Sequence, residues 1–109
     1  MNLFKITTHL SEILEESEKN PVIIFKYSNQ CESSDTLKTE LEKNITNKKL
    51  KNSIYLLTVQ EKPILSKKIA EFFNIKHESP QIIIISRGLV TYSASHFDIK
   101  INDFSYGIM

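Results

Sequence analysis

Cys31 is the only cysteine of the chain, and its neighbours favour a reactive thiol. It follows an apolar run of strand length and precedes a helical pattern, which places it at the N-terminus of a helix. There, unpaired backbone N–H groups and the helix dipole favour the thiolate, which is the nucleophilic form. The hydroxyl of Ser34, three residues on, can reach the sulfur and would favour the same form. Glu32 opposes this effect, because a neighbouring carboxylate raises the pKa of a thiol.

A free cysteine can instead be a buried core residue. The residues on both sides of Cys31 are all polar, which argues against a core position: Asn29, Gln30, Glu32, Ser33 and Ser34. A single cysteine also excludes an internal disulfide and a four-cysteine metal site. The sequence therefore favours a reactive thiol and predicts no metal site.

Two further residues are expected near this thiol. Pro80 directly precedes an apolar strand pattern, and the pattern alone favours a trans peptide bond, since only about 5–6% of X–Pro bonds in folded proteins are cis. The strand after Pro80 turns at Gly88 and returns, so His96 should come back beside Pro80. His96 could pair with the thiolate or carry protons near neutral pH, or it could be a solvated loop residue.

Apolar periodicity predicts the elements that position these residues. In chain order they are a helix containing Leu10, Ile13 and Leu14, a strand at 22–25, a helix containing Leu37, Leu41 and Ile45, a strand at 54–59, a helix from Pro63 to Asn74, strands at 81–85 and 89–93, and a short helix around 99–104. A short extra strand at 4–6 would fit the same pattern.

Polar residues ahead of three helical patterns are candidate N-caps, because their side chains can accept from the first backbone N–H groups. The candidates are Thr7 or Thr8 for the first helix, Ser28, Asn29 or Ser33 for the second, and Asp98 for the last.

The order of these elements predicts one α/β domain over residues 1–109. Strands separated by helices should pair in parallel through right-handed crossovers, and the short turn at Gly88 should give an antiparallel hairpin. A βαβ unit followed by a ββα unit is the thioredoxin-like architecture. We therefore expect a central mixed sheet of four or five strands flanked by helices.

Composition narrows the function classes. The net charge is only +1 and Arg87 is the only arginine, so neither a nucleic-acid partner nor an arginine-built phosphate site is indicated. No stretch approaches the ~20 apolar residues of a membrane span, and the first residues lack the apolar run of a signal peptide. A cytoplasmic protein without a membrane partner is expected.

Two segments together resemble the monothiol bacilliredoxin family, also called YtxJ or bacilliredoxin C. The first is residues 21–28 followed by Cys31 and Ser34, and the second is residues 77–81 with 94–99 after the hairpin. The Cys-x-x-Ser pair alone is weakly specific, whereas the His-Glu-Ser-Pro-Gln run with the later Ser-His pair is much more specific. The resemblance covers nearly the whole chain.

The resemblance implies a thioredoxin-like fold and a cis bond at Pro80, against the trans preference of the pattern alone. It implies that Ser79 offers backbone groups to an incoming extended chain. It also implies a monothiol oxidoreductase in which Cys31 removes bacillithiol, or glutathione, from S-thiolated proteins. This small thiol would be a co-substrate, with no bound cofactor.

The chain departs from the usual family pattern around the site. Gln30 and Glu32 flank the cysteine where Thr and Pro are usual, Tyr27 replaces a histidine, and Phe97 replaces a tryptophan.

Two other functions fit a Cys-x-x-Ser pair on this fold. Monothiol glutaredoxins share an iron–sulfur cluster between two chains, although Glu32 would crowd and repel such an anionic cluster. A redox-silent protein-binding module is the other. An exposed single cysteine could also join two chains by a disulfide on oxidation.

Overall fold

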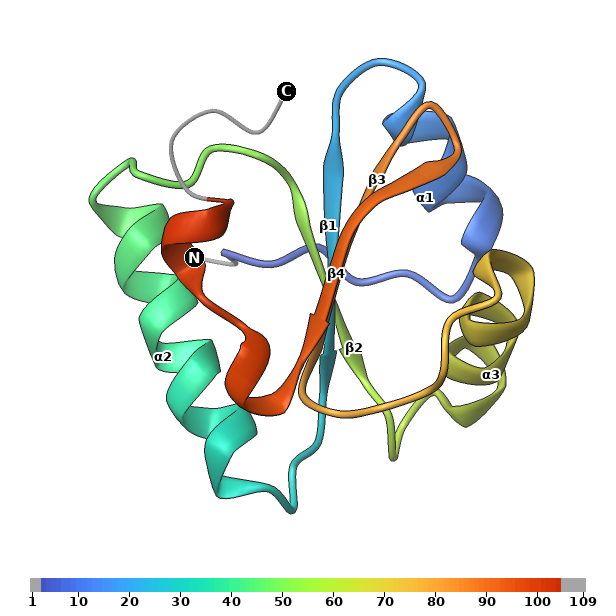
Figure 1. Ribbon diagram of the computed structural model, residues 1–109. Helices are drawn as coiled ribbons and strands as arrows, with labels where there is room; N and C mark the ends of the chain where they lie inside the picture. Colours follow the sequence, from blue (N-terminus) through green and yellow to red (C-terminus); the bar gives the residue numbers. More distant parts are fainter. Residues whose placement is uncertain (1–2, 105–109) are drawn as a thin grey trace.

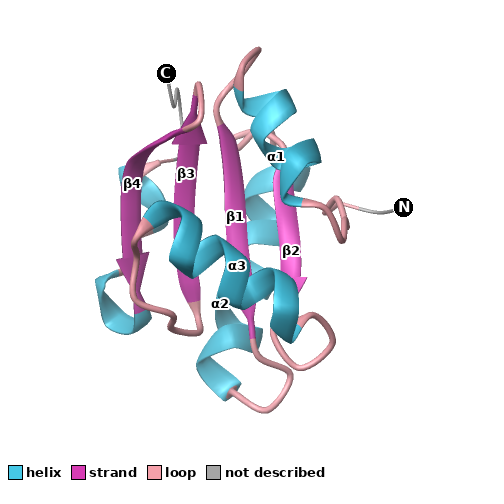
Figure 2. Cartoon of the chain, turned by 90° about the vertical axis from the view of Figure 1, so that its right-hand side faces the viewer, coloured by secondary structure: helices cyan, strands magenta, loops and turns pink. Residues whose placement is uncertain are grey.

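A four-stranded mixed sheet forms the centre of the protein, as seen in a computed structural model that describes residues 3–104. The strand order is β2-β1-β3-β4, which Figure 2 shows from one face. β1 pairs in parallel with β2 and antiparallel with β3, and β3 pairs antiparallel with β4. The strands are β1 (Val22–Tyr27), β2 (Ile54–Thr58), β3 (Gln81–Ser86) and β4 (Leu89–Ser95).

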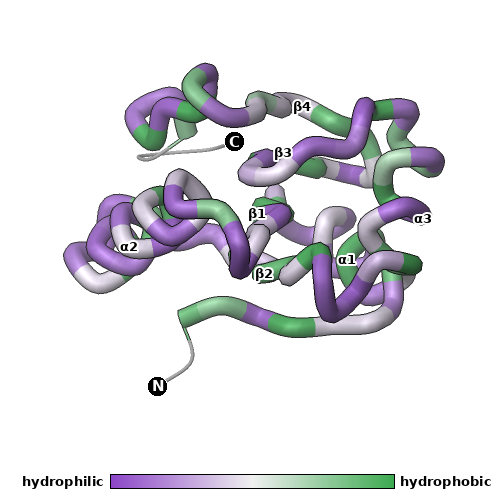
Figure 3. Tube along the Cα trace, turned by 90° about the horizontal axis from the view of Figure 1, so that it is seen from below, coloured by the Kyte–Doolittle hydropathy of each residue, from purple (hydrophilic) through white to green (hydrophobic). Residues whose placement is uncertain are grey.

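Helices cover both faces of this sheet. α2 (Glu32–Thr46) lies on one face, and α1 (Leu10–Ser17) and α3 (Pro63–Phe73) lie on the other (Figures 1 and 3). Two short 3₁₀ helices, η1 (His96–Asp98) and η2 (Ile101–Asp103), follow β4 on the α2 side. The expected mixed sheet flanked by helices is confirmed. The parallel pairing expected of strands separated by helices holds for β1 and β2 but is wrong for β3, which runs antiparallel to β1.

β1 is buried on both faces, as its continuous apolar run predicts. Ile23 and Phe25 belong to the core on the α2 side, whereas Val22 and Ile24 belong to the core under α1 and α3. All four side chains are fully buried. Burying a side chain of this size contributes about 1.5–3 kcal/mol, so β1 anchors the loop that follows it.

The β3–β4 hairpin turns through Arg87 and Gly88, which have φ angles of 52° and 74°. Positive φ at both central residues is typical of the tight turn that suits the twist of a hairpin. Ser17 holds this turn, because its carbonyl accepts from the Arg87 N–H (2.8 Å) and its Oγ accepts from the Gly88 N–H (3.1 Å). The predicted antiparallel hairpin is confirmed.

Both outer strands carry an irregular feature. The expected strand at 4–6 is reduced to a bridge, in which Lys5 pairs with β2 at Tyr55. On β4 the register shifts between the pairs Ile84–Tyr92 and Ile85–Val90, so Thr91 is an extra residue on the outer strand.

The predicted N-caps are wrong at all three helices. The N-cap of α1 is His9, and Thr7 instead accepts from the His9 N–H at 3.1 Å and donates to Glu12 at 2.8 Å. The N-cap of α2 is Cys31 itself, without a side-chain cap bond. The candidates just before it, Ser28 and Asn29, lie in the connecting loop, and Ser33 lies inside the helix.

The single helix expected around 99–104 is replaced by η1 and η2, and Lys100 rather than Asp98 precedes η2. The apolar residues here do not follow a helical period. Ile99 and Ile101 pack half-buried against the core, and Phe104 is buried with its ring centroid 5.6 Å from that of Tyr92. Two short turns, rather than one continuous helix, place these residues against the core.

Candidate active site

Cys31 lies at the N-terminus of α2, and a short polar loop connects it to the end of β1. Its backbone is extended (φ −124°, ψ 117°), and its carbonyl accepts from the N–H groups of Ser34 (3.1 Å) and Asp35 (3.2 Å). The thiol is partly exposed and free. Cys31 therefore occupies the helix N-terminus that the sequence predicts, in reach of solvent.

The hydroxyl nearest to the sulfur belongs to Ser33. Its Oγ lies 3.1 Å from Cys31 Sγ. This contact first, and then the backbone N–H of Ser34, lower the pKa of Cys31, while burial works weakly against them. The pKa of the Cys31 thiol is therefore lowered overall, although Glu32 is its neighbour in the sequence. The thiolate is thus favoured at the site, mainly through a residue that the Cys-x-x-Ser spacing does not point to.

Ser34, the predicted thiolate-stabilising residue, has mainly another partner. Its side chain is fully buried, and its Oγ accepts from the backbone N–H of Ser28 at 3.3 Å. Its hydroxyl contributes less to the lowered pKa of Cys31 than the Ser33 hydroxyl does. The geometry therefore gives Ser34 chiefly the role of fastening α2 to the loop before Cys31.

Gln60 braces the same loop from the end of β2. Its Oε1 accepts from the Asn29 N–H (3.1 Å), and its Nε2 donates to Ser28 Oγ (2.7 Å). Ser28 in turn accepts the Cys31 N–H at its carbonyl (3.3 Å). The position of the thiol is thus tied to two neighbouring strands.

The Ser79–Pro80 peptide bond is cis, so the trans preference drawn from the pattern alone is wrong and the expectation from the family resemblance is confirmed. Pro80 is buried and Ser79 is half-buried at the start of β3. The Pro80 carbonyl accepts from the His96 N–H at 3.0 Å. The hairpin therefore returns His96 to Pro80 as predicted.

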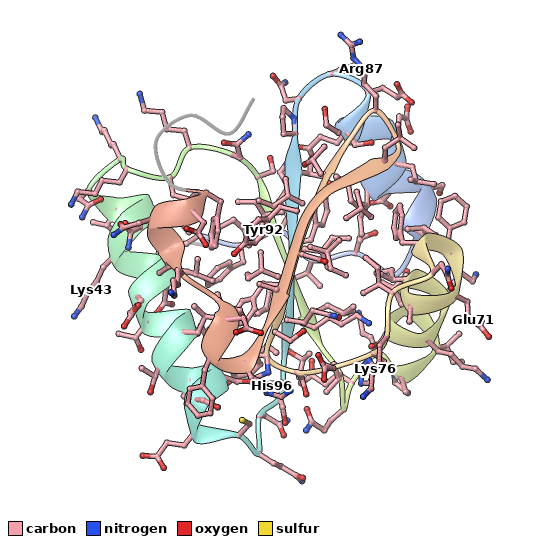
Figure 4. The ribbon with its side chains drawn as sticks, in the orientation of Figure 1. Lys43, Glu71, Lys76, Arg87, Tyr92 and His96 are labelled. Carbon is pink, nitrogen blue, oxygen red and sulfur yellow. The ribbon has the colours of Figure 1, made fainter. Side chains whose placement is uncertain are left out.

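His96 is exposed and has a φ of 53° at the point where β4 ends. Figure 4 labels it at the edge of the sheet where α2 begins. Its Nε2 lies 3.7 Å from Oε1 of Glu78. Hydrogen bonding from Ser95, and more weakly the charge of His96, lower the pKa of Glu78 despite its small desolvation. A carboxylate thus faces the imidazole.

These residues meet around a groove of about 340 Å³, which we call the α2 groove. Its lining includes Ser33, Leu37, Pro80, His96 and Phe97. The ring of Phe97 is 94% exposed, although the residue is large and apolar. The structure therefore brings the serine beside the thiol, the cis-proline and the predicted histidine to one concave surface with an apolar rim.

Tyr27, at the end of β1, is bound to the first turn of α2. Its hydroxyl donates a short hydrogen bond to Asp35 Oδ1, and this bond, with burial, raises the pKa of Tyr27. The Lys38 ammonium lies 5.3 Å from the Tyr27 ring centroid. The tyrosine at this position therefore supports α2.

A buried lysine on β1 was not predicted from the sequence. Lys26 is fully buried, and its Nζ donates to the Ser66 carbonyl and lies near Nδ1 of His77, both at 3.1 Å. Burial lowers the pKa of Lys26 to about 8. One lysine beside a phenylalanine at a strand end gives no signal of burial, because its partners lie 40 and 51 residues away along the chain.

The chain also matches a known protein family over almost its whole length. The family model of the monothiol bacilliredoxin BrxC matches residues 3–104. The chain belongs to the monothiol bacilliredoxin family. The matched range contains Cys31, Pro80 and His96.

Solved structures similar to this bacilliredoxin share the fold. One is a protein with a thioredoxin fold for which an oxidoreductase activity has been suggested, at 26% identity and a TM-score of 0.77, covering 92% of this chain and 88% of that one. A mutant thioredoxin from Halobacterium salinarum NRC-1 is 12% identical, with a TM-score of 0.68 and coverages of 95% and 92%. Mitochondrial thioredoxin 3 from Saccharomyces cerevisiae is 18% identical, with a TM-score of 0.64 and coverages of 84% and 81%. The fold is that of thioredoxin, and family and fold together support a thiol oxidoreductase.

No group of three or more His, Cys, Asp or Glu side chains within residues 3–104 is arranged to hold a metal ion. No helix in the same range is long and apolar enough to cross a membrane.

Proposed function

We propose that this bacilliredoxin removes a low-molecular-weight thiol from mixed disulfides on proteins, with Cys31 as the nucleophile. One observation carries the proposal: a partly exposed thiol of lowered pKa, 3.1 Å from the Ser33 hydroxyl, beside a groove that cis-Pro80 and His96 also line. A thiolate attacks disulfides, and a pKa near the ambient pH gives the best compromise between its abundance and its reactivity.

The first step exchanges one disulfide for another. The Cys31 thiolate attacks the small-thiol sulfur of the mixed disulfide, a new S–S bond forms between them, and the old S–S bond breaks. The electron pair of that bond leaves with the target protein as a thiolate, which takes a proton. His96 is the proposed proton carrier, since it lines the groove and faces Glu78.

The second step restores the enzyme. Because the chain has no second cysteine, an external thiol must attack the small-thiol sulfur bound to Cys31. That attack forms a disulfide between two small thiols and releases the Cys31 thiolate. We propose that this second thiol comes from the same low-molecular-weight pool, in the reducing cytoplasm.

A surface of this bacilliredoxin beside Cys31 is suited to hold the target protein. Ser79 and Pro80 lie at the start of β3, where half-buried Ser79 can offer backbone groups to an extended segment of the target. Phe97 supplies an exposed apolar contact at the rim of the α2 groove. We propose that these groups hold the target chain while the small thiol reaches the sulfur.

Bacillithiol is the proposed small thiol, because the matched family is named for it, and glutathione is the comparison. The test is intact mass spectrometry after mixing the reduced protein with a test protein carrying either thiol as a mixed disulfide. We expect the test protein to lose its cap and a single adduct of the cap's mass to appear on Cys31. The Cys31→Ser variant should give neither. Full removal of the cap by Cys31→Ser would contradict the proposal.

A further inference from the structure

A cavity of about 780 Å³ lies beside α3, on the face of the sheet opposite to the α2 groove. We call it the α3 cavity. Its volume is within the range of about 300–1,000 Å³ that is usual for small-molecule sites. The residues of its lining used below are Gln60, Ser66, Lys67, Glu71, Lys76 and His77.

Gln60 connects this cavity with the loop that carries the thiol. It lines the cavity and is also bound to Asn29 and Ser28, two and three residues before Cys31. One residue of the cavity lining therefore also holds the loop that carries Cys31. A ligand in this cavity would contact a residue that supports the Cys31 loop.

The charged residues of the lining favour an anion. Lys67 and Lys76 outnumber the single acidic residue of the lining, Glu71. Figure 4 shows Glu71 at the outer side of α3, whereas Lys76 lies on the segment between α3 and β3. The buried charge of Lys26 lies directly behind Ser66 and His77, with its Nζ 3.1 Å from the Ser66 carbonyl.

The imidazole of His77 adds a neutral donor to these charges. Burial first, and then the charge of Lys26, lower the pKa of His77, while Glu78 opposes them more weakly. Nδ1 lies 3.1 Å from both Lys26 Nζ and Ser66 Oγ. Since an ammonium can only donate, Nδ1 accepts and the proton of the neutral ring stays on Nε2. The lining thus includes an imidazole whose Nε2 carries the proton, together with Lys67 and Lys76.

We propose that the α3 cavity binds a carboxylate group of the small thiol whose sulfur reacts at Cys31. Bacillithiol and glutathione both carry carboxylates away from the sulfur, and Lys67, Lys76 and the His77 Nε2–H are suitable partners for them. This inference rests on the proposed function and deepens it. It assigns recognition of the small thiol to the α3 face and recognition of the target protein to the α2 groove.

The first test compares caps with and without a carboxylate. Test proteins would carry bacillithiol, glutathione or 2-mercaptoethanol, and cap transfer would be timed for the variant Lys67→Gln/Lys76→Gln. We expect transfer of the two carboxylate-bearing caps to slow by about three- to tenfold, as for two exposed ion pairs, with the 2-mercaptoethanol cap unaffected. The matched control Lys51→Gln/Lys68→Gln removes the same charge outside the cavity and should leave all three transfer rates unchanged. Equal slowing of all three caps, or no slowing, would overturn the inference.

The second test measures binding without chemistry. S-methyl bacillithiol and S-methyl glutathione cannot form disulfides, so each would be titrated into the Cys31→Ser variant while amide resonances are followed by NMR. We expect shifts at Gln60, Ser66, Lys67, Lys76 and His77. If these shifts appear but the wild-type protein transfers no cap, the cavity is upheld and the proposed function is rejected. Cap transfer by the wild type without such shifts would reject the cavity and uphold the function.

Discussion

Cys31 Sγ and Ser33 Oγ lie 3.1 Å apart in the first turn of α2. The next serine along the helix directs its hydroxyl mainly to the backbone of Ser28. Two adjacent hydroxyls at one helix terminus therefore have separate tasks, because one contacts the reactive sulfur and the other fastens the helix.

Ser33→Ala should raise the pKa of the Cys31 thiol, since it removes the largest contribution that lowers it. We expect the alkylation rate of Cys31 by iodoacetamide at pH 7 to fall by about two- to fivefold, because the thiolate is the reacting form. The pKa itself is measured from thiolate absorbance against pH.

Ser34→Ala is the matched comparison. It should change the thiol pKa less and cost about 1 kcal/mol of unfolding free energy, because it removes a buried hydrogen-bond acceptor from the Ser28 N–H. A larger rise in the thiol pKa for Ser34→Ala than for Ser33→Ala would contradict this division of tasks.

Phe97→Ser should slow the reaction with a capped protein and spare the reaction with a small disulfide. The ring is 94% exposed, so its loss should change the unfolding free energy by no more than about 0.5 kcal/mol. The measurement is cap transfer from a test protein beside reduction of oxidised 2-mercaptoethanol. Leu89→Ser, at another exposed apolar residue far from the groove lining, is the control, and equal losses in both variants would argue against target docking at Phe97.

His96→Asn tests the proposed proton carrier. Asparagine tolerates the positive φ of this position better than most residues, so the backbone and its bond to the Pro80 carbonyl should persist. We expect cap transfer to slow by roughly tenfold at most, less than the 10²–10⁴-fold typical of strong acid–base catalysis, because thiolates leave easily. An unchanged rate of cap transfer in His96→Asn would remove His96 from the mechanism.

Lys26→Met should alter the pH dependence of stability. The pKa of Lys26 is about 8 in the folded protein and 10.5 as its ordinary value, so the unfolded chain binds more protons between these limits. The stability of the wild type relative to the variant should therefore rise with pH from about 8 to 10.5, by at most about 3.4 kcal/mol at about 1.36 kcal/mol per pKa unit.

Urea unfolding of both proteins over this pH range measures the difference. Lys19→Met, at an exposed lysine, is the control for the loss of one positive charge. A flat difference between the wild type and Lys26→Met would mean that Lys26 keeps its ordinary pKa in the folded protein.

The order of the elements was predictable because it depends on local apolar periodicity. The runs at 22–25 and 81–85 are buried on both faces, as continuous apolar strands usually are. The helix ends were less predictable, since several polar residues precede each helix and the tertiary contacts choose among them. Thr7, for example, is held by Glu12 rather than capping α1 itself.

The site was predictable where residues close in sequence determine it. The return of His96 to Pro80 follows from hairpin geometry, and the place of Cys31 follows from the strand–helix order. The partners of Lys26 and the link from Gln60 to the Cys31 loop depend on contacts at least 31 residues apart, which one sequence does not reveal. The choice of Ser33 over Ser34 depends on side-chain directions within one turn.

The irregular features at the two edges of the sheet bear on aggregation of the protein at high concentration. An unpaired strand edge is a template for another copy, and fibrils grow from such edges. Here the backbone of Lys5 occupies the outer edge of β2. Its N–H donates to the Ile54 carbonyl (2.8 Å), and its carbonyl accepts from the Leu56 N–H (2.9 Å). The extra residue Thr91 interrupts the regular ladder of β4 on the other side. Two chains joined through an oxidised Cys31 would therefore remain a dimer, because neither sheet edge invites further strands to add.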